Sequence, residues 1–317
     1  GRLDYAAGNL GLNTKYQATP ERPAVLYSGV FEEGGKPQLI EAHHEGDKLF
    51  PFKGRATLGK VIPSLLKRFP TNPLYARATI EEIFPVARLS TTQRLTATEF
   101  QSGVFLSQPN GSHRFDALSR MAQIAPIYGM AAGDFDGDGK ADLYVVQNSY
   151  APIPETGRFD GGLSLLLRGD GHGHFDAMPA LESGLIVPGD AKGLVVGDFD
   201  DNGWPDFFIT RNNDITLAYL NRGAAGQNCF GVSLHGPKGN VPAVGALIKV
   251  VMTDGSFQAA EVSAGGGYLS QSGTVSFFGY SPTNPPKEIR VRWPSGKATS
   301  HSWLGSQKII TFAQPAD

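Results

Sequence analysis

The sequence predicts an all-β protein with two domains and a small helical insert. Three observations lead to this prediction: an excess of turn-forming residues, short apolar runs typical of buried strands, and an aspartate-rich turn that occurs twice. The 317 residues include 40 glycines and 22 prolines, whereas average usage of the two together is roughly 12%. This excess predicts many tight turns between short strands. At about 150 residues per domain, the length predicts two domains.

Composition excludes several classes of protein. The formal charge of −2 and the pI near 6.4 give no electrostatic reason to expect nucleic acid as a partner. No apolar run approaches the ~18 residues of a transmembrane segment. The single cysteine, Cys229, excludes an internal disulfide framework. The chain opens at Gly1 without a signal segment, so we expect it to be a piece of something longer.

The main repeat is an acidic turn at 133–144 (GDFDGDGKADLY) and 197–208 (GDFDDNGWPDFF), 64 residues apart. Oxygen-bearing side chains occupy positions 1, 3, 5 and 9 of both copies. In the loop 134–142 (loop 1) and the loop 198–206 (loop 2), the predicted side-chain ligands are Asp134, Asp136, Asp138, Asp142, Asp198, Asp200, Asn202 and Asp206. Position 7, Lys140 or Trp204, would offer its backbone carbonyl, because neither side chain ligates a hard cation.

This spacing predicts two structural calcium sites. Several hard oxygens at flexible spacing suit Ca²⁺, whereas Mg²⁺ demands strict octahedral geometry. Crowded carboxylates would also repel one another without a cation. The loops are not EF-hands, because Val145 and Ile209 stand where a bidentate glutamate is needed. Short apolar flanks predict a strand on each side of each loop. The alternative is a pair of acidic turns on a solvated face.

A third, degenerate copy lies at 29–40 (GVFEEGGKPQLI). Val30, Glu32, Gly34 and Gln38 replace the four ligand positions. We expect the same backbone turn without a metal, since one carboxylate cannot hold Ca²⁺ against water. Two further strand–turn–strand units are predicted at 103–115 and 163–175.

The segment GDFDGDGKADLYVV resembles the FG-GAP/VCBS repeat. The resemblance implies blades of an integrin-type β-propeller with cations in such loops. A repeat near 60 residues matches one four-stranded blade, but two clear blades and a degenerate one cannot close a ring of at least four. We therefore expect a partial or truncated propeller, and favour truncation.

Residues 53–85 break the strand pattern. Leu58, Ile62, Leu65 and Phe69 follow helical spacing, and Pro63 is suited to open a second helix. Residues 73–84 predict another short helix. This insert resembles one in bacterial members of the family, and we expect it to cap the propeller edge.

The composition changes after residue 222. Six strands are predicted, in segments starting at residues 230, 246, 257, 275, 288 and 308. The segments VGALIKV (244–250), AGGGYLSQS (264–272) and IRVRWPSG (289–296) are similar to the ASPIC/UnbV module of cartilage acidic protein-like sequences. The predicted domains are thus propeller blades at 1–222 and a small β-sandwich or barrel at 223–317.

These observations predict a non-catalytic, calcium-binding protein that is secreted, periplasmic or exposed at the cell surface. Its propeller would be a scaffold for an unknown protein or glycan ligand. No catalytic residue is predicted, because the clustered carboxylates are committed to the cation loops. The alternative is the non-catalytic portion of a larger secreted or surface enzyme, for example one acting on polysaccharide. A membrane-tethered lipoprotein is a third, weaker hypothesis. The tripeptide Arg168-Gly169-Asp170 is interpreted as hairpin-turn chemistry rather than as an adhesion motif.

Overall fold

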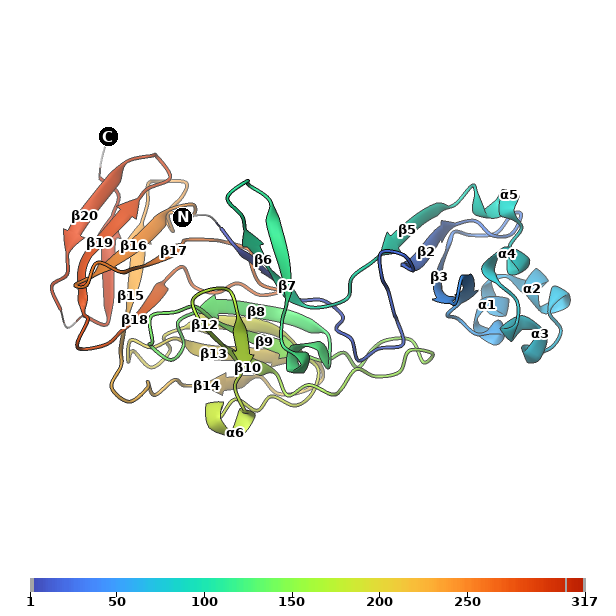
Figure 1. The fold of residues 1–317 in the computed structure, drawn as a ribbon, viewed down its shortest axis with the longest axis horizontal. Helices are drawn as coiled ribbons and strands as arrows, with labels where there is room; N and C mark the ends of the chain where they lie inside the picture. Colours follow the sequence, from blue (N-terminus) through green and yellow to red (C-terminus); the bar gives the residue numbers. More distant parts are fainter. Residues whose placement is uncertain (1–2, 306, 316–317) are drawn as a thin grey trace. The chain divides into compact units, whose positions relative to one another are not determined.

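The computed structural model describes residues 3–305 and 307–315 and is mostly β, as predicted (Figure 1). Its contacts form two compact units. Unit 1 comprises Gly1–Asn9, Ser102–Tyr150 and Asp160–Asp317. Unit 2 comprises Leu10–Gln101 and Ala151–Phe159. Unit 2 carries five of the short α-helices, and each unit has its own hydrophobic core.

The first part of unit 1 consists of three antiparallel sheets, in the strand orders β1-β6-β7, β8-β9-β10-β11 and β12-β13-β14. The strands are β1 (Tyr5–Ala7), β6 (Gly103–Ser107), β7 (His113–Ala117), β8 (Ile127–Gly133), β9 (Asp142–Gln147), β10 (Leu165–Gly169), β11 (Phe175–Ala177), β12 (Ala191–Gly197), β13 (Asp206–Arg211) and β14 (Leu217–Tyr219). A short 3₁₀ turn, η1 (Arg120–Gln123), and the helix α6 (Ala180–Ser183) connect them. The second sheet pairs its four strands in chain order, which is the form of a propeller blade.

The pairing of β1 with β6 was not predicted. Tyr5 lies opposite Phe105, so most of unit 2 is inserted between two neighbouring strands of one sheet. Pairing over such a separation leaves no local pattern in the sequence.

The second part of unit 1 is a sandwich of two sheets, β18-β15-β21 and β17-β16-β19-β20. Its strands are β15 (Asn228–His235), β16 (Leu247–Met252), β17 (Phe257–Glu261), β18 (Ser276–Tyr280), β19 (Pro286–Arg292), β20 (Ala298–Ser302) and β21 (Ile309–Ala313). Phe230, Ile248 and Trp293 are buried between the sheets. The six predicted strands are present. The seventh, β20, was missed because this edge strand is polar and contains no large apolar residue.

Unit 2 packs five helices against one sheet of order β4-β3-β2-β5. These elements are β2 (Ala24–Gly29), β3 (Gln38–Glu45), β4 (Lys48–Pro51), β5 (Gln93–Ala97), α1 (Arg55–Val61), α2 (Pro63–Arg68), α3 (Asn72–Ala76), α4 (Ile80–Ile83) and α5 (Val86–Leu89). Pro63 opens α2, as predicted. The helices bury Leu58, Leu65 and Ile80 in one core with Val25 and Ile40 of the sheet. The insert therefore packs on the sheet whose strands β2 and β3 flank the segment 29–40, the predicted degenerate blade. That it caps a propeller edge stays a prediction.

The degenerate copy at 29–40 matches the acidic loops only at its ends. Gly29 pairs with Gln38 as Gly133 pairs with Asp142, so each connection spans the same number of residues. Inside the turn the backbones differ. Within 29–40 a positive φ occurs at Gly34 alone, at position 5. Both acidic loops have positive φ at positions 4 and 6 instead. The expectation of an identical backbone turn is wrong, and the segment belongs to unit 2.

The predicted boundary after residue 222 is not where contacts divide the chain. Unit 1 contains both the blade-like sheets and the sandwich, while the whole of unit 2 lies within the predicted first domain. One physical reason is that the helices and the sheet of unit 2 share a core of their own. The other is that the acidic loops contact the sandwich directly.

Candidate metal centre

Loop 1 connects β8 to β9 in a tight curl. The left-handed φ angles of Gly137 (78°) and Gly139 (87°) permit this curl. It brings carboxylate oxygens of Asp134, Asp136 and Asp138 within 4.8 Å of one another. Asp134 is buried, whereas Asp138 is exposed, so the cluster extends from the interior to solvent.

Backbone amides hold the first carboxylate of loop 1 in place. The N–H of Gly137 donates to Asp134 Oδ1 at 2.7 Å, and that of Gly139 donates to Asp134 Oδ2 at 2.8 Å. Asp136 accepts from the N–H of Asp138 at 3.1 Å. Local bonds of this kind fix the side chains that converge on the centre of the curl.

Loop 2 connects β12 to β13 in a similar curl, with positive φ angles at the same two positions, 4 and 6. Its converging carboxylates are those of Asp198, Asp200 and Asp206, again within 4.8 Å. The N–H of Gly203 donates to Asp198 Oδ2 at 2.8 Å, as Gly139 does in loop 1. The converging sets differ in one member: loop 1 gathers positions 1, 3 and 5, whereas loop 2 gathers positions 1, 3 and 9. The two loops therefore share the curl and the anchoring of the first carboxylate, but not the whole carboxylate set.

Asn202, at position 5 of loop 2, makes different contacts with each end of its amide. Its Oδ1 accepts from the N–H of Trp204 at 2.7 Å, and its Nδ2 donates to the carbonyl of Asn221 at 2.8 Å. The structure therefore places Asn202 in the loop but ties its amide to the strand connection that follows β14.

The position-9 aspartate joins the loop to the neighbouring strand. Asp142 is 1% exposed. Its Oδ1 accepts from the N–H of Gly169 at 2.9 Å, and its Oδ2 accepts from that of Phe135 at 3.1 Å. Both oxygens accept from backbone donors, and Asp142 is not one of the three converging carboxylates of loop 1. Asp206, at the same position of loop 2, also accepts from two backbone donors but does belong to the converging set.

Two other aspartates occupy the same place in their own sheets. Asp206 Oδ1 accepts from the N–H of Asn221 at 2.7 Å, and Asp4 Oδ1 accepts from that of Ser107 at 2.7 Å. In each sheet, one residue of the next strand lies directly opposite the aspartate. The residue that follows it in the chain donates its backbone N–H to the carboxylate. Asp4 was not singled out from the sequence, although the spacing Gly-X-X-Asp at 1–4 repeats that of 139–142 and 203–206.

Arginines from neighbouring segments face the position-3 carboxylates. Arg168 Nε lies 2.7 Å from Asp136, and a terminal nitrogen of Arg222 lies 3.0 Å from Asp200. Sequence spacing did not reveal these pairs, because each arginine lies more than 20 residues from its partner. The pair also accounts for Arg168 of the Arg-Gly-Asp tripeptide, whose guanidinium contacts loop 1.

Burial and mutual repulsion disfavour the simultaneous ionisation of all four aspartates of loop 1 when no cation is bound. Burial, together with the nearby carboxylates of Asp142 and Asp138, raises the pKa of Asp134 to about 7, although hydrogen bonds from backbone N–H groups oppose the shift. Burial likewise raises the pKa of Asp142 to about 6. Such groups are stabilised in their charged form by a bound cation.

The side chains of the position-7 residues make contacts of other kinds: an ion pair for Lys140 and ring packing for Trp204. Lys140 Nζ lies 3.4 Å from Asp138 Oδ2. The Trp204 ring packs so closely on two glycines that an added Cβ would come within 2.7 Å of it at Gly137 and 2.8 Å at Gly223. The carbonyl ligands predicted for Lys140 and Trp204 stay predictions.

The donor set fits a hard divalent cation. Each loop offers three convergent carboxylates, all of them oxygen donors, and this chemistry matches Ca²⁺ better than a thiophilic metal. Calcium would supply charge neutralisation and cross-link the ligands.

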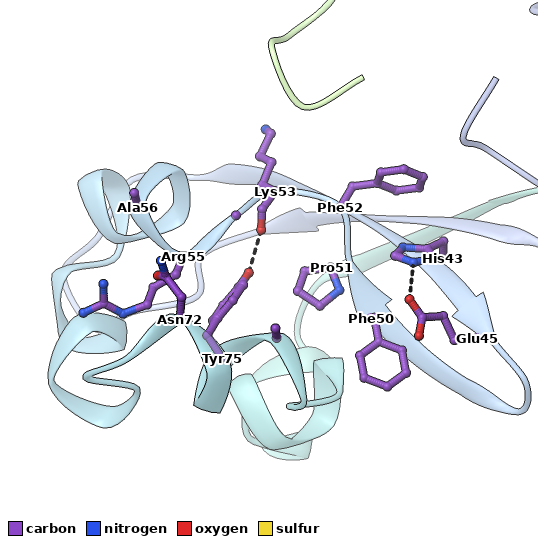
Figure 2. Close-up of a pocket in the computed structure, with 12 residues that line it drawn as sticks. His43, Glu45, Phe50, Pro51, Phe52, Lys53, Arg55, Ala56, Asn72 and Tyr75 are labelled. Atoms are coloured by element: carbon purple, nitrogen blue, oxygen red, sulfur yellow. Dashed lines mark hydrogen bonds and ion pairs between the residues drawn. The ribbon is translucent and has the colours of Figure 1, made fainter. Parts of the chain in front are cut away.

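A separate pocket of about 400 Å³ lies in unit 2 between β3–β4 and the helices (Figure 2). Phe50, Phe52 and Tyr75 form much of its wall. Figure 2 shows two polar contacts within it: the Tyr75 hydroxyl donates to the Lys53 carbonyl at 2.7 Å, and His43 Nε2 lies 3.2 Å from Glu45. Nothing in this pattern selects a ligand.

Comparisons with known families match two segments of the chain. The FG-GAP repeat matches residues 127–158, which include β8, loop 1 and β9. The family described as ASPIC and UnbV matches residues 236–317. No curated protein matches the chain significantly. Among the described residues, no helix has the length and apolar character needed to cross a membrane.

Proposed function

Since the chain is an FG-GAP repeat protein with a C-terminal ASPIC and UnbV domain, we propose that it is a calcium-stabilised, non-catalytic scaffold. These two domains are typical of a repeat-containing, extracellular-type protein. The sheets of unit 1 would present a surface to a protein or glycan ligand, and loops 1 and 2 would each hold one structural Ca²⁺.

The convergence of three carboxylates in each of two similar loops is the observation that carries this proposal. Both loops gather three carboxylates within 4.8 Å, and both set an arginine against position 3. Two unrelated acidic surface turns would not share this pattern of donors and ion pairs. The convergent oxygens favour a metal site over solvated turns.

A structural role for calcium follows from the anchoring of the loops. Asp142 accepts a buried hydrogen bond from Gly169 of β10, and Asp206 accepts a partly buried one from Asn221, which follows β14. A cation bound to the same loop would therefore stabilise the blade around it. Because binding occurs only in the folded state, it raises stability by mass action.

The proposed location is extracytoplasmic: secreted, periplasmic or at the cell surface. Extracellular calcium modules bind with dissociation constants of about 10⁻⁴–10⁻³ M. Weak sites of that kind are filled where calcium is millimolar, so the proposed role suits such a compartment.

Thermal unfolding with and without calcium tests the proposal. We expect millimolar Ca²⁺ to raise the melting temperature above that in a chelator, and Mg²⁺ to raise it less. The double variant Asp136→Asn/Asp200→Asn, which removes one converging carboxylate from each loop, should lose most of the calcium response. An identical melting temperature in Ca²⁺ and chelator would contradict the proposal.

A further inference from the structure

Loop 1 is in direct contact with the C-terminal sandwich. The N–H of Gly279, in β18, donates to Asp134 Oδ2 at 3.0 Å in a buried position. The carbonyl of Gly279 accepts from Gln258 Nε2 of β17 at 2.6 Å. The first-position aspartate therefore shares one carboxylate between its own loop and a strand 145 residues away.

Gly279 is a glycine because of this contact. Its φ is not in the left-handed region, so backbone conformation does not require glycine. A Cβ on Gly279 would lie 2.3 Å from both Asp134 Oδ2 and the Gly137 Cα. Contacts that short force one side to move, and the neighbour here is the backbone of the proposed cation loop.

Loop 2 contacts the sandwich at the neighbouring position. Lys308, which precedes β21, donates from Nζ to the carbonyl of Asp201 at 2.6 Å. A Cβ built on Gly203 would lie 3.2 Å from the Lys308 Cβ and 3.5 Å from the carbonyl oxygen of Cys229. Loop 2 thus lies against the start of β15 and against the residue that precedes β21.

These contacts meet at one pair of opposite residues in the sandwich sheet, which we call the rung. Cys229 of β15 lies directly opposite Gly279 of β18. The Gly279 side of this rung contacts loop 1, and the Cys229 side is close to loop 2. The two loops therefore contact the same rung from different strands.

The connection into the sandwich also contacts both loops. Asn221 donates from Nδ2 to the carbonyl of Phe135, at position 2 of loop 1, at 2.9 Å. Its backbone donates to Asp206 and accepts from Asn202, both in loop 2. Asn221 lies in the segment between β14 and β15 that leads into the sandwich.

We infer that loops 1 and 2 together form a cation-dependent clamp on the Cys229–Gly279 rung, so that cation binding and attachment of the C-terminal sandwich are coupled. This inference rests on the proposed calcium sites. A cation that orders the loop fixes the Asp134 carboxylate, which in turn is the acceptor for the Gly279 N–H. By linkage, disturbing the rung must weaken cation binding as much as losing the cation loosens the rung.

Two measurements test the coupling. Hydrogen exchange on the wild-type protein, with Ca²⁺ and in metal-free buffer, reports on the β18 peptide and on the segment around Lys308. Calcium titration calorimetry compares Gly279→Ala with the matched control Gly273→Ala. Gly273 has no atom within 4 Å of a built Cβ and no left-handed φ, so alanine fits there.

We expect Ca²⁺ to slow exchange in β18 as well as in the loops. We expect Gly279→Ala to weaken calcium binding at one site by about tenfold, with Gly273→Ala unchanged. The clamp would be overturned if Ca²⁺ slows hydrogen exchange in the loops alone and if Gly279→Ala and Gly273→Ala bind Ca²⁺ with equal affinity. Because the wild type would still bind Ca²⁺, the proposed function would stand. An absence of calcium binding to the wild type would overturn both. If Gly279→Ala does not fold, exchange on the wild type still decides.

Discussion

At the scale of single residues, the acidic side chains of loop 1 make different contacts. The position-9 residue Asp142 is committed to backbone donors, whereas Asp136 and Asp138 reach the less buried side of the cluster. Sequence spacing identified all of these aspartates. It did not identify Arg168 or Gly279, because both reach loop 1 from other strands.

The charge difference between the loops predicts an order of calcium affinity. Loop 2 carries Asn202 where loop 1 carries Asp138, so loop 2 should bind more weakly. Asp138→Asn should weaken loop 1 by about tenfold, and Asn202→Asp should strengthen loop 2. Calorimetry measures both. Asp201→Asn is the control, since it removes the same charge outside the converging group; an equal effect of Asp201→Asn would contradict site-specific ligation.

The raised pKa of Asp134 predicts how stability depends on pH without metal. The folded-state pKa is about 7, against about 3.9 in an unfolded chain. The folded state thus holds more protons in this window, and the free energy of unfolding should fall as pH rises from about 4 to about 7. Asp142, with a pKa of about 6, acts in the same direction.

Urea denaturation in metal-free buffer at about pH 4 and about pH 7 checks this. The slope from Asp134 is at most about 1.4 kcal/mol per pH unit, and Asp134→Asn should reduce it. If the wild type and Asp134→Asn show the same slope of unfolding free energy against pH, the pKa of Asp134 in the folded state is close to its ordinary value.

At the scale of elements, local patterns predicted strands and turns, and long-range pairing escaped them. The strands flanking the acidic loops and helices α1 and α2 were predicted because period and turn residues are local signals. The β1–β6 pair and the polar edge strand β20 were missed, since one depends on residues about 100 apart and the other has no apolar face. The contact between loop 1 and β18 is equally non-local.

Close packing of β10 on loop 1 gives an element-scale prediction. A Cβ on Gly169 would lie 2.0 Å from the carbonyl oxygen of Ala141. Gly169→Ala should therefore separate β10 from the loop and cost about 1–3 kcal/mol of stability by overpacking. Chemical denaturation measures the loss. Gly273→Ala, in open surroundings, is expected to be neutral or slightly stabilising; equal stability of the two variants would refute the steric argument.

At the scale of the whole molecule, both acidic loops belong to unit 1, and unit 2 has a core of its own. The sequence predicted a domain boundary after residue 222, where composition changes. Contacts instead group the loops with the sandwich, because the loops pack on β18 and on Lys308.

This division predicts two thermal transitions, of which one responds to calcium. Scanning calorimetry should show that chelation lowers the transition of unit 1 and leaves that of unit 2 unchanged. Leu65 is 2% exposed in unit 2. Leu65→Ala should lower the temperature of the calcium-independent transition only, because it reduces the free energy of unfolding of unit 2 by about 2–5 kcal/mol. Calcium sensitivity of both transitions to the same extent would contradict the assignment of the sites to unit 1.

Calcium titration calorimetry on the wild-type chain tests the central claim most directly. We predict two Ca²⁺ ions per chain, with one site lost in Asp136→Asn and the other in Asp200→Asn. No binding heat at millimolar calcium, or two sites that survive both substitutions, would show that the acidic loops do not hold the ion.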